Sequence, residues 1–258
     1  NGDIRKSAVV DRDRQFVMLL NGSIADGVIV VTPAATHFPT QAPVVVIDPN
    51  NECPEYPAIV ATTREGALEA MRYLIGLGHH RIGFITGRLD LMSANHRLQG
   101  YREGLAEAGI PVDEELIRVG DYTTEVALEC ARSLLSMPEP PTAIFASNDM
   151  SAMGVYQAAR EAGVRIPQDL SVVGFDNIYE AALLSPPLTT IDQSILEMGS
   201  LAVEMLVTLV RGETLESHQH IIPTQLIVRE SCAPIQSNQT DAWDLLGESR
   251  QTESENRR

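Results

Sequence analysis

The feature that most constrains this fold is an alternation of short apolar runs with stretches of helical periodicity. Six apolar runs span residues 27–33, 43–48, 81–87, 142–147, 170–176 and 220–228, and most of them are rich in Val and Ile and apolar on both faces, as buried parallel strands are. Apolar residues recur at helical spacing within residues 64–77, 96–108, 150–163 and 197–211. Glycines that can stop a helix follow these stretches, at Gly78, Gly109, Gly163 and Gly212. The alternation predicts an α/β fold whose parallel sheets are covered by helices on both faces.

Length and charge narrow the possible partners. The 258 residues suffice for one large α/β domain or for two small lobes with their own cores. The net charge of −16 repels phosphate backbones, so contact with DNA would need a separate basic module. No apolar run reaches the roughly 18 residues of a membrane span, and the polar opening is no signal peptide. Because the chain opens with Asn1 rather than Met, a signal or a domain upstream remains possible.

Signals for an enzyme or a metal site are weak. The chain has no GxSxG elbow, no Walker loop and no GxGxxG fingerprint. The three cysteines are scattered without a CxxC pair, which fits a reducing compartment: Cys53, Cys130 and Cys232. His79 and His80 are adjacent, which is a poor spacing for metal ligands. His218 and His220 alternate near a predicted strand start and are only a weak indication of a metal site. We therefore expect no catalytic residue, no metal and no cofactor.

Polar side chains follow several predicted strands, where ligands of parallel α/β sheets bind. Six of them are candidates: Ser93, Arg97, Tyr122, Asn148, Asp149 and Asp176. Arg97 offers a fork of donors for hydroxyl, carboxylate or phosphate groups, or it is a solvated helix residue. The pair at 148–149 could instead cap a helix, and Asp176 could be a turn residue. Tyr122 could stack on a ligand ring or fill the core.

Several motifs, in order and in register over about residues 20–235, closely resemble the lactose/galactose repressor (LacI/GalR) family. They are GHHRIGFITG at 78–87, RLQGYREGL at 97–105, FASNDMSAMGV at 145–155, SVVGFDN at 171–177, PPLTTIDQ at 186–193 and PTQLIVRES at 223–231. The resemblance implies a fold similar to type I periplasmic binding proteins, with two Rossmann-like lobes, parallel sheets and a ligand cleft between them.

The resemblance also implies lobe boundaries. The amino-terminal lobe would comprise residues 1–77 plus 195–222, and the carboxy-terminal lobe residues 78–194 plus 223–236. Crossovers would fall near Gly78, Ser194 and Pro223. The polar residues 237–258 are interpreted as a disordered tail, although a helix docking through Trp243 is an alternative.

By position, the resemblance assigns roles to the candidate residues. Arg97 matches the family's effector-binding arginine, and Asp176 matches the aspartate that holds ligand hydroxyls or amines. The Asn–Asp pair at 148–149 has its counterpart in the family. Two positions that often line the cleft are occupied by Ser93 and Tyr122. Gln193 and Ile195, at the expected hinge, are further candidates.

The chain departs from the family's pattern in three places. Neither the usual helix-turn-helix nor the basic hinge helix is present. Residues 1–26 match the region of the family's second helix, so its first core strand and first helix are expected to be absent and the amino-terminal lobe incomplete. Thr62 and Thr63 stand where the family often carries Asp–Asn, and Glu65 could compensate.

The implied function is allosteric sensing in the cytoplasm. A small polar effector, a sugar or a derivative, would re-orient the lobes and control operator binding through an upstream DNA-binding domain. A homodimer would present two such domains, with a surface around residues 178–187. The alternative is a secreted sugar-binding protein for transport, which shares the fold. An enzyme of doubly wound architecture is a third possibility, and it would need an activated nucleophile in the cleft.

Overall fold

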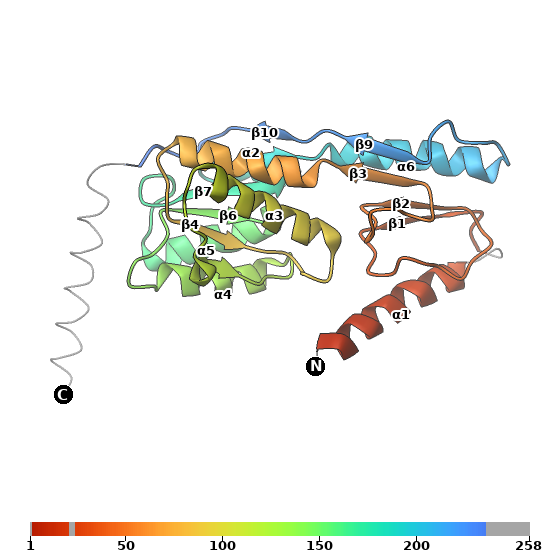
Figure 1. Cartoon of the computed structure of the whole chain (residues 1–258), viewed down its shortest axis with the longest axis horizontal. Helices are drawn as coiled ribbons and strands as arrows, with labels where there is room; N and C mark the ends of the chain where they lie inside the picture. Colours follow the sequence, from red (N-terminus) through yellow and green to blue (C-terminus); the bar gives the residue numbers. More distant parts are fainter. Residues whose placement is uncertain (1, 21–23, 236–258) are drawn as a thin grey trace.

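The computed structural model describes residues 2–20 and 24–235, with side chains from Ser7 onward. The predicted tail at 237–258, including Trp243, lies outside the described residues. Two lobes lie side by side, and each consists of a sheet between helices (Figure 1). The predicted class, an α/β protein of two lobes with parallel sheets, is confirmed.

The first lobe is a parallel four-stranded sheet in the order β1–β2–β3–β9. Its elements are β1 (Val28–Val31), β2 (Val44–Ile47), β3 (Ala58–Ala61), β9 (Gln219–Ile222), and the helices α1 (Gly2–Leu20) and α6 (Ile195–Val210). The two helices cover opposite faces of the sheet (Figure 1). Val44 joins Val17 of α1 in one buried cluster, and Val45 joins Met205 of α6 in another. Successive strand residues point to opposite faces, so the Val run of β2 is buried on both.

The second lobe is a six-stranded sheet in the order β10–β8–β7–β6–β4–β5. Its strands are β4 (Ile82–Ile85), β5 (Ile117–Arg118), β6 (Ala143–Ala146), β7 (Ser171–Asp176), β8 (Thr189–Asp192) and β10 (Gln225–Ile227). Its helices are α2 (Thr63–Gly76), α3 (Met92–Glu107), α4 (Thr124–Leu135) and α5 (Asp149–Ala162), with the 3-10 turns η1 (Glu114–Leu116) and η2 (Tyr179–Leu183). Only β10 runs antiparallel to its neighbour.

Helix α2 belongs to the second lobe, which corrects the predicted boundary near Gly78. Its buried Ala67 and Met71 share a cluster with Phe84 and Tyr101 of the second lobe. The amphipathic pattern of residues 64–77 predicts the helix, but it does not say which sheet the apolar stripe covers. The chain first crosses between the sheets at residue 62, directly after β3.

The four predicted helices are confirmed as α2, α3, α5 and α6, and the glycine after each has a positive φ. The run at 220–228, expected as one strand, is divided at Pro223 into β9 and β10, which belong to different sheets. The predicted strands and helices do not include β3, β5, β8 and α4. Strand β8 contains the buried Thr189 and Thr190. Because threonine carries a hydroxyl group, these residues interrupt the apolar pattern that predicts a buried strand.

On each face of the second sheet, two helices pack closely against each other at a glycine. A Cβ on Gly100 of α3 would lie 2.5 Å from the carbonyl oxygen of Arg64, and one on Gly154 of α5 would lie 2.5 Å from that of Thr124. We expect Gly100→Ala and Gly154→Ala each to lower the free energy of unfolding by about 1–3 kcal/mol through overpacking. Urea unfolding followed by circular dichroism measures this. Gly76→Ala is the control, because a Cβ there has open space, and it should leave stability unchanged or raise it.

Strand β1 forms an open edge of the first sheet. The backbone N–H groups of Val28 and Thr32 donate to β2 and its flank, at Pro43 and Ile47. Backbone groups alternate in direction along a strand, so those of residues 29 and 31 face away from β2. Among the described residues no strand pairs with that side.

In the part of the chain that the structure describes, three crossings connect the lobes, at residues 61–63, 192–195 and 222–225. Hydrogen bonds tie the first and third together: the N–H of Thr224 donates to the hydroxyl of Thr62 at 2.8 Å, and the Thr224 hydroxyl donates to the Thr62 carbonyl at 3.1 Å. Thr62 therefore lies at the first crossing and is hydrogen-bonded to the third.

Candidate functional site: the cleft between the lobes

A cleft of about 570 Å³ lies between the lobes, at the carboxyl ends of the strands. The first lobe contributes the ends of β1 and β2 and the start of α6, and the second contributes residues that follow β4, β5 and β6 and the last residue of β7. Five of the six predicted site residues line it: Ser93, Arg97, Tyr122, Asn148 and Asp176. Gln193 and Ile195 also line it, from the second crossing. The strand-end argument therefore predicted the location of the cleft.

Arg97 occupies the floor of the cleft and is only 4% exposed. Its guanidinium carbon lies 4.0 Å from the ring centre of Phe175 and 5.6 Å from that of Tyr122. Nη2 donates to Oδ1 of Asp176 over a long 3.4 Å, and Nε is buried without a hydrogen-bond partner. An unsatisfied buried donor is costly, so this arginine retains hydrogen-bonding capacity that the fold does not use.

Asp176 is the last residue of β7 and lies beside Arg97 at the cleft. Its Oδ1 accepts a hydrogen bond of 2.7 Å from Nε2 of Gln193. Burial raises the pKa of the Asp176 carboxyl to about 7; Arg97 opposes this shift, and the carboxylates of Asp149 and Asp48 add to it. A carboxyl that changes its charge near neutral pH can meet a ligand either as acceptor or as donor.

Tyr122 and Ser93 form one wall of the cleft. The Tyr122 ring lies over Gly87, where any Cβ would be 2.0 Å from the ring, so residue 87 must be glycine for the ring to lie there. The hydroxyls of Tyr122 and Ser93 are 3.5 Å apart. Burial raises the pKa of Tyr122, against the effect of Arg97, so the phenol stays neutral and can both donate and accept.

Asn148 and Asp149 separate, although they are adjacent in sequence. Asn148 caps α5 by accepting the N–H of Ser151, donates to the Tyr122 carbonyl and still lines the cleft. Asp149 does not line it: the side chain is fully buried, accepts the N–H of Ile178 and the hydroxyl of Thr190, and burial raises its pKa to about 6. The prediction that Asp149 binds ligand directly is not supported by this position.

The first lobe supplies residues that the sequence analysis missed. Thr32 and Asp48 follow β1 and β2 and line the cleft, with a distance of 3.4 Å between the Thr32 hydroxyl and Asp48 Oδ2. The same strand-end argument would have found both. Met198 lines the cleft from α6 and also belongs to the buried cluster of the first lobe. Glu65, considered as a compensating residue, is exposed and does not line the cleft.

Backbone strain concentrates around the cleft. Within the described residues, six non-glycine residues have positive φ: Thr32, Asp48, Tyr122, Asp176, Asn177 and Ser194. The first four line the cleft, and the other two are chain neighbours of Asp176 and Gln193. Such conformations cost about 1–3 kcal/mol each and persist where surrounding contacts enforce them, typically at functional sites.

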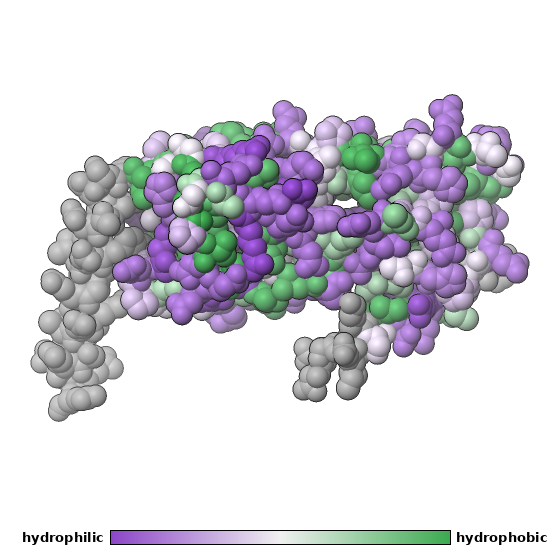
Figure 2. Space-filling model, in the orientation of Figure 1, coloured by the Kyte–Doolittle hydropathy of each residue, from purple (hydrophilic) through white to green (hydrophobic). Residues whose placement is uncertain are grey.

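The chemistry of the cleft suits binding. Its polar groups are two arginines (Arg88 and Arg97), carboxylates, hydroxyls and amides beside apolar side chains, which is the composition of a small-molecule site. Among residues 2–20 and 24–235, no group of three or more His, Cys, Asp or Glu residues is placed to hold a metal ion. No helix in this part of the chain is long and apolar enough to span a membrane. Figure 2 shows a largely hydrophilic face with separate apolar patches.

The fold and the cleft define a two-lobed ligand-binding protein of the periplasmic-binding type. Residues 71–232 match the family model of the periplasmic binding protein-like domain. The chain is 33% identical over 233 residues to the HTH-type transcriptional regulator DegA of Bacillus subtilis, covering 87% of this chain and 69% of DegA. It is 38% identical over 177 residues to the HTH-type transcriptional repressor CytR of Escherichia coli, covering 69% and 52%. The chain thus spans about half the length of CytR.

Solved structures agree with these relatives. The transcriptional regulator CelR in complex with cellobiose is similar with a TM-score of 0.74 and 32% identity, covering 84% of this chain and 69% of that one. A LacI-family regulatory protein from Chloroflexus aggregans is similar with a TM-score of 0.73 and 32% identity, covering 87% and 82%. The chain belongs to the LacI family of transcriptional regulators.

Proposed function

We propose that this chain is the effector-sensing part of a transcriptional repressor and that it binds, without transforming it, a small polar ligand such as a sugar. The observation that carries the proposal is the buried Arg97, which lines a cleft formed by both lobes together with Asp176 and whose Nε has no hydrogen-bond partner among the described residues. A ligand that contacts both lobes binds their arrangements unequally, and this difference is what allows allosteric control. The protein would act in the cytoplasm through a DNA-binding domain outside this chain.

Isothermal titration calorimetry against cellobiose, D-ribose and adenosine tests the proposal. Cellobiose is included because the similar regulator CelR binds it. At least one probe, or another member of a wider sugar and nucleoside panel, should bind and raise the melting temperature. Absence of binding across the panel, or turnover of a bound sugar, would contradict the proposed sensing role.

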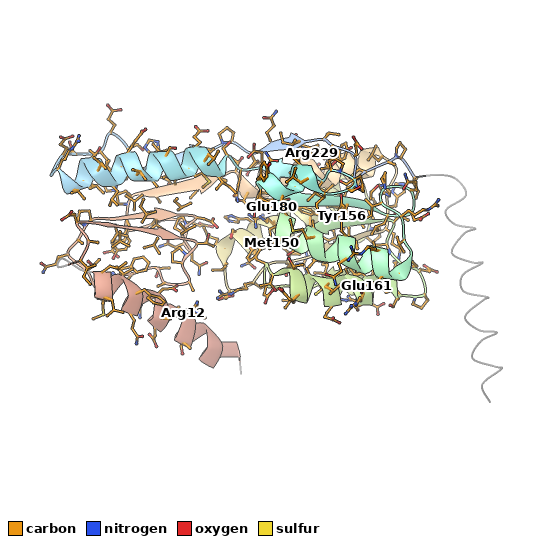
Figure 3. All side chains as sticks on the ribbon, turned by 180° about the vertical axis from the view of Figure 1, so that it is seen from behind. Arg12, Met150, Tyr156, Glu161, Glu180 and Arg229 are labelled. Atoms are coloured by element: carbon orange, nitrogen blue, oxygen red, sulfur yellow. The ribbon has the colours of Figure 1, made fainter. Side chains whose placement is uncertain are left out.

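A homodimer through the second lobe is part of the proposal. Tyr179 is 77% exposed and Leu183 is 64% exposed on η2, within the predicted surface at residues 178–187. Met150 and Glu180 lie on the same face of the second lobe in Figure 3, and Met150 is also exposed. Large apolar side chains gathered on one face are typical of protein interfaces.

Acidic residues introduced on this face should prevent the protomers from associating. We expect a Tyr179→Glu, Leu183→Glu double variant to sediment as a monomer where the parent sediments as a dimer, because buried like charges oppose association. Val119→Glu is the control, since Val119 is comparably exposed but distant in sequence from η2. A parent that is monomeric at high concentration would contradict the dimer.

A further inference from the structure

The turn that presents Asp176 to the cleft is strained in two successive residues. The φ of Asp176 is 107° and that of Asn177 is 56°, both in the region that favours glycine. A side chain at either position adopts this conformation only if other contacts hold it there. The structure shows such contacts on both sides of the turn.

The side chain of Asn177 is held at both ends. Its Oδ1 accepts a hydrogen bond of 2.6 Å from Nη2 of Arg229, and its Nδ2 donates to Oδ2 of Asp192 at 3.1 Å. Arg229 is itself fixed, because its Nη1 donates to the carbonyl of Leu188 at 2.6 Å. Figure 3 labels Arg229 on the second lobe. The planar guanidinium can serve both acceptors at once.

Asp149 holds the backbone just beyond the turn. Its Oδ2 accepts the N–H of Ile178 at 2.9 Å, and its Oδ1 accepts the hydroxyl of Thr190 at 2.6 Å. The carboxylate fits because residue 174 is glycine: a Cβ there would lie 2.2 Å from Oδ1 of Asp149. This contact explains why a fully buried carboxylate follows the cap residue Asn148.

The same contacts reach the second crossing between the lobes. Oδ1 of Asp192 accepts the N–H of Ser194 at 2.7 Å, while Oδ2 accepts from Asn177. Gln193, between them in sequence, donates to Asp176. The carboxylate in the cleft and the hinge are therefore connected through a single set of hydrogen bonds.

We propose that Asn177, Arg229 and Asp149 form a clamp that positions Asp176 for effector binding. The inference rests on the proposed function, since it names positioning residues for the same cleft. None of the three lines the cleft, so they act through Asp176. A purely structural turn is the alternative, in which these contacts stabilise the fold and leave the orientation of Asp176 unaffected.

Asn177→Gly separates the two interpretations. Glycine adopts a φ of 56° without strain, so the variant loses the side-chain contacts while the backbone becomes easier to form. Arg229→Lys is a second route, because lysine cannot serve both Leu188 and Asn177 with a planar fork. Arg72→Lys is the matched control, on an exposed pair with Glu107 of α3.

Two readouts are compared in the parent and the variants of the full chain. The first is the titration of the Asp176 carboxyl carbon by NMR, assigned with Asp176→Asn. The second is calorimetry with cellobiose, D-ribose and adenosine.

In Asn177→Gly and Arg229→Lys, we expect the midpoint of the Asp176 titration to fall by at least about one pH unit as the carboxyl turns toward water. Affinity for a probe that the parent binds should fall about tenfold, through loss of one charge-assisted hydrogen bond. Arg72→Lys should change neither.

The outcomes are distinct. A melting temperature of Asn177→Gly close to that of the parent, together with a shifted midpoint, supports the clamp. An unchanged midpoint in both variants overturns it, and so does an unchanged affinity for a probe that the parent binds. If no probe binds the parent but the midpoint shifts, the proposed function fails while the clamp stands.

Discussion

Replacing Arg97 by Met should weaken effector binding by at least about a hundredfold, because two charge-assisted hydrogen bonds contribute roughly 1.5–3 kcal/mol each. The methionine chain fills similar space beside Phe175 but removes the guanidinium over the Phe175 ring and every donor. The loss also leaves Asp176 without its nearby cation. Calorimetry with the tightest ligand of the panel measures the change.

Arg72→Met provides the comparison for this variant, since Arg72 forms an exposed ion pair with Glu107 on the far side of α2 from the sheet. It should bind the ligand as the parent does, because exposed pairs contribute little. Thermal melting of both variants shows that the fold is retained. If Arg97→Met bound the ligand as tightly as the parent, the assignment of the cleft as the effector site would be wrong.

Affinity should rise by about a hundredfold between pH 5 and pH 8, because the ionised Asp176 accepts ligand hydroxyls better than the neutral acid does. The pKa of this carboxyl is raised to about 7, so most molecules at pH 5 carry it protonated. Binding should then release a proton, which calorimetry in buffers of different ionisation enthalpy detects. In Asp176→Asn the remaining affinity should lose this pH dependence.

The ligand-free protein should show the opposite trend in stability. A carboxyl whose pKa is raised on folding binds its proton more tightly when folded. Its contribution to stability is complete below about pH 4 and is lost as the pH rises through about 7. Comparison of urea unfolding for the parent and Asp176→Asn across this range isolates it. A constant difference between the two would show that Asp176 titrates normally.

The sequence predicted the cleft better than the connections around it. Apolar runs and glycine stops located four helices and six strand regions, because burial imposes periodicity on neighbouring residues. The lobe to which α2 belongs could not be predicted in this way, since its stripe of Ala67 and Met71 would fit either sheet. Contacts between residues far apart in sequence decide that question.

Asp149 illustrates the same limit within the site. Asn and Asp are both ordinary residues at a helix start, so the pair at 148–149 suggested one shared role. The partner that distinguishes them is Thr190, which lies 41 residues further on. Thr32 and Asp48 are different, because the rule that points to strand ends applied to them as much as to Asp176.

Because one side of β1 is unpaired among the residues that the structure describes, the isolated chain has an edge through which molecules can associate. Its apolar residues offer outward-facing N–H and carbonyl groups at positions 29 and 31, and Val31 is 63% exposed. An unpaired strand edge of this kind can pair with a further strand, either from a neighbouring molecule or from an added peptide. If the isolated chain aggregates through this edge, its association should grow with concentration. A charged residue at position 31 should suppress that association.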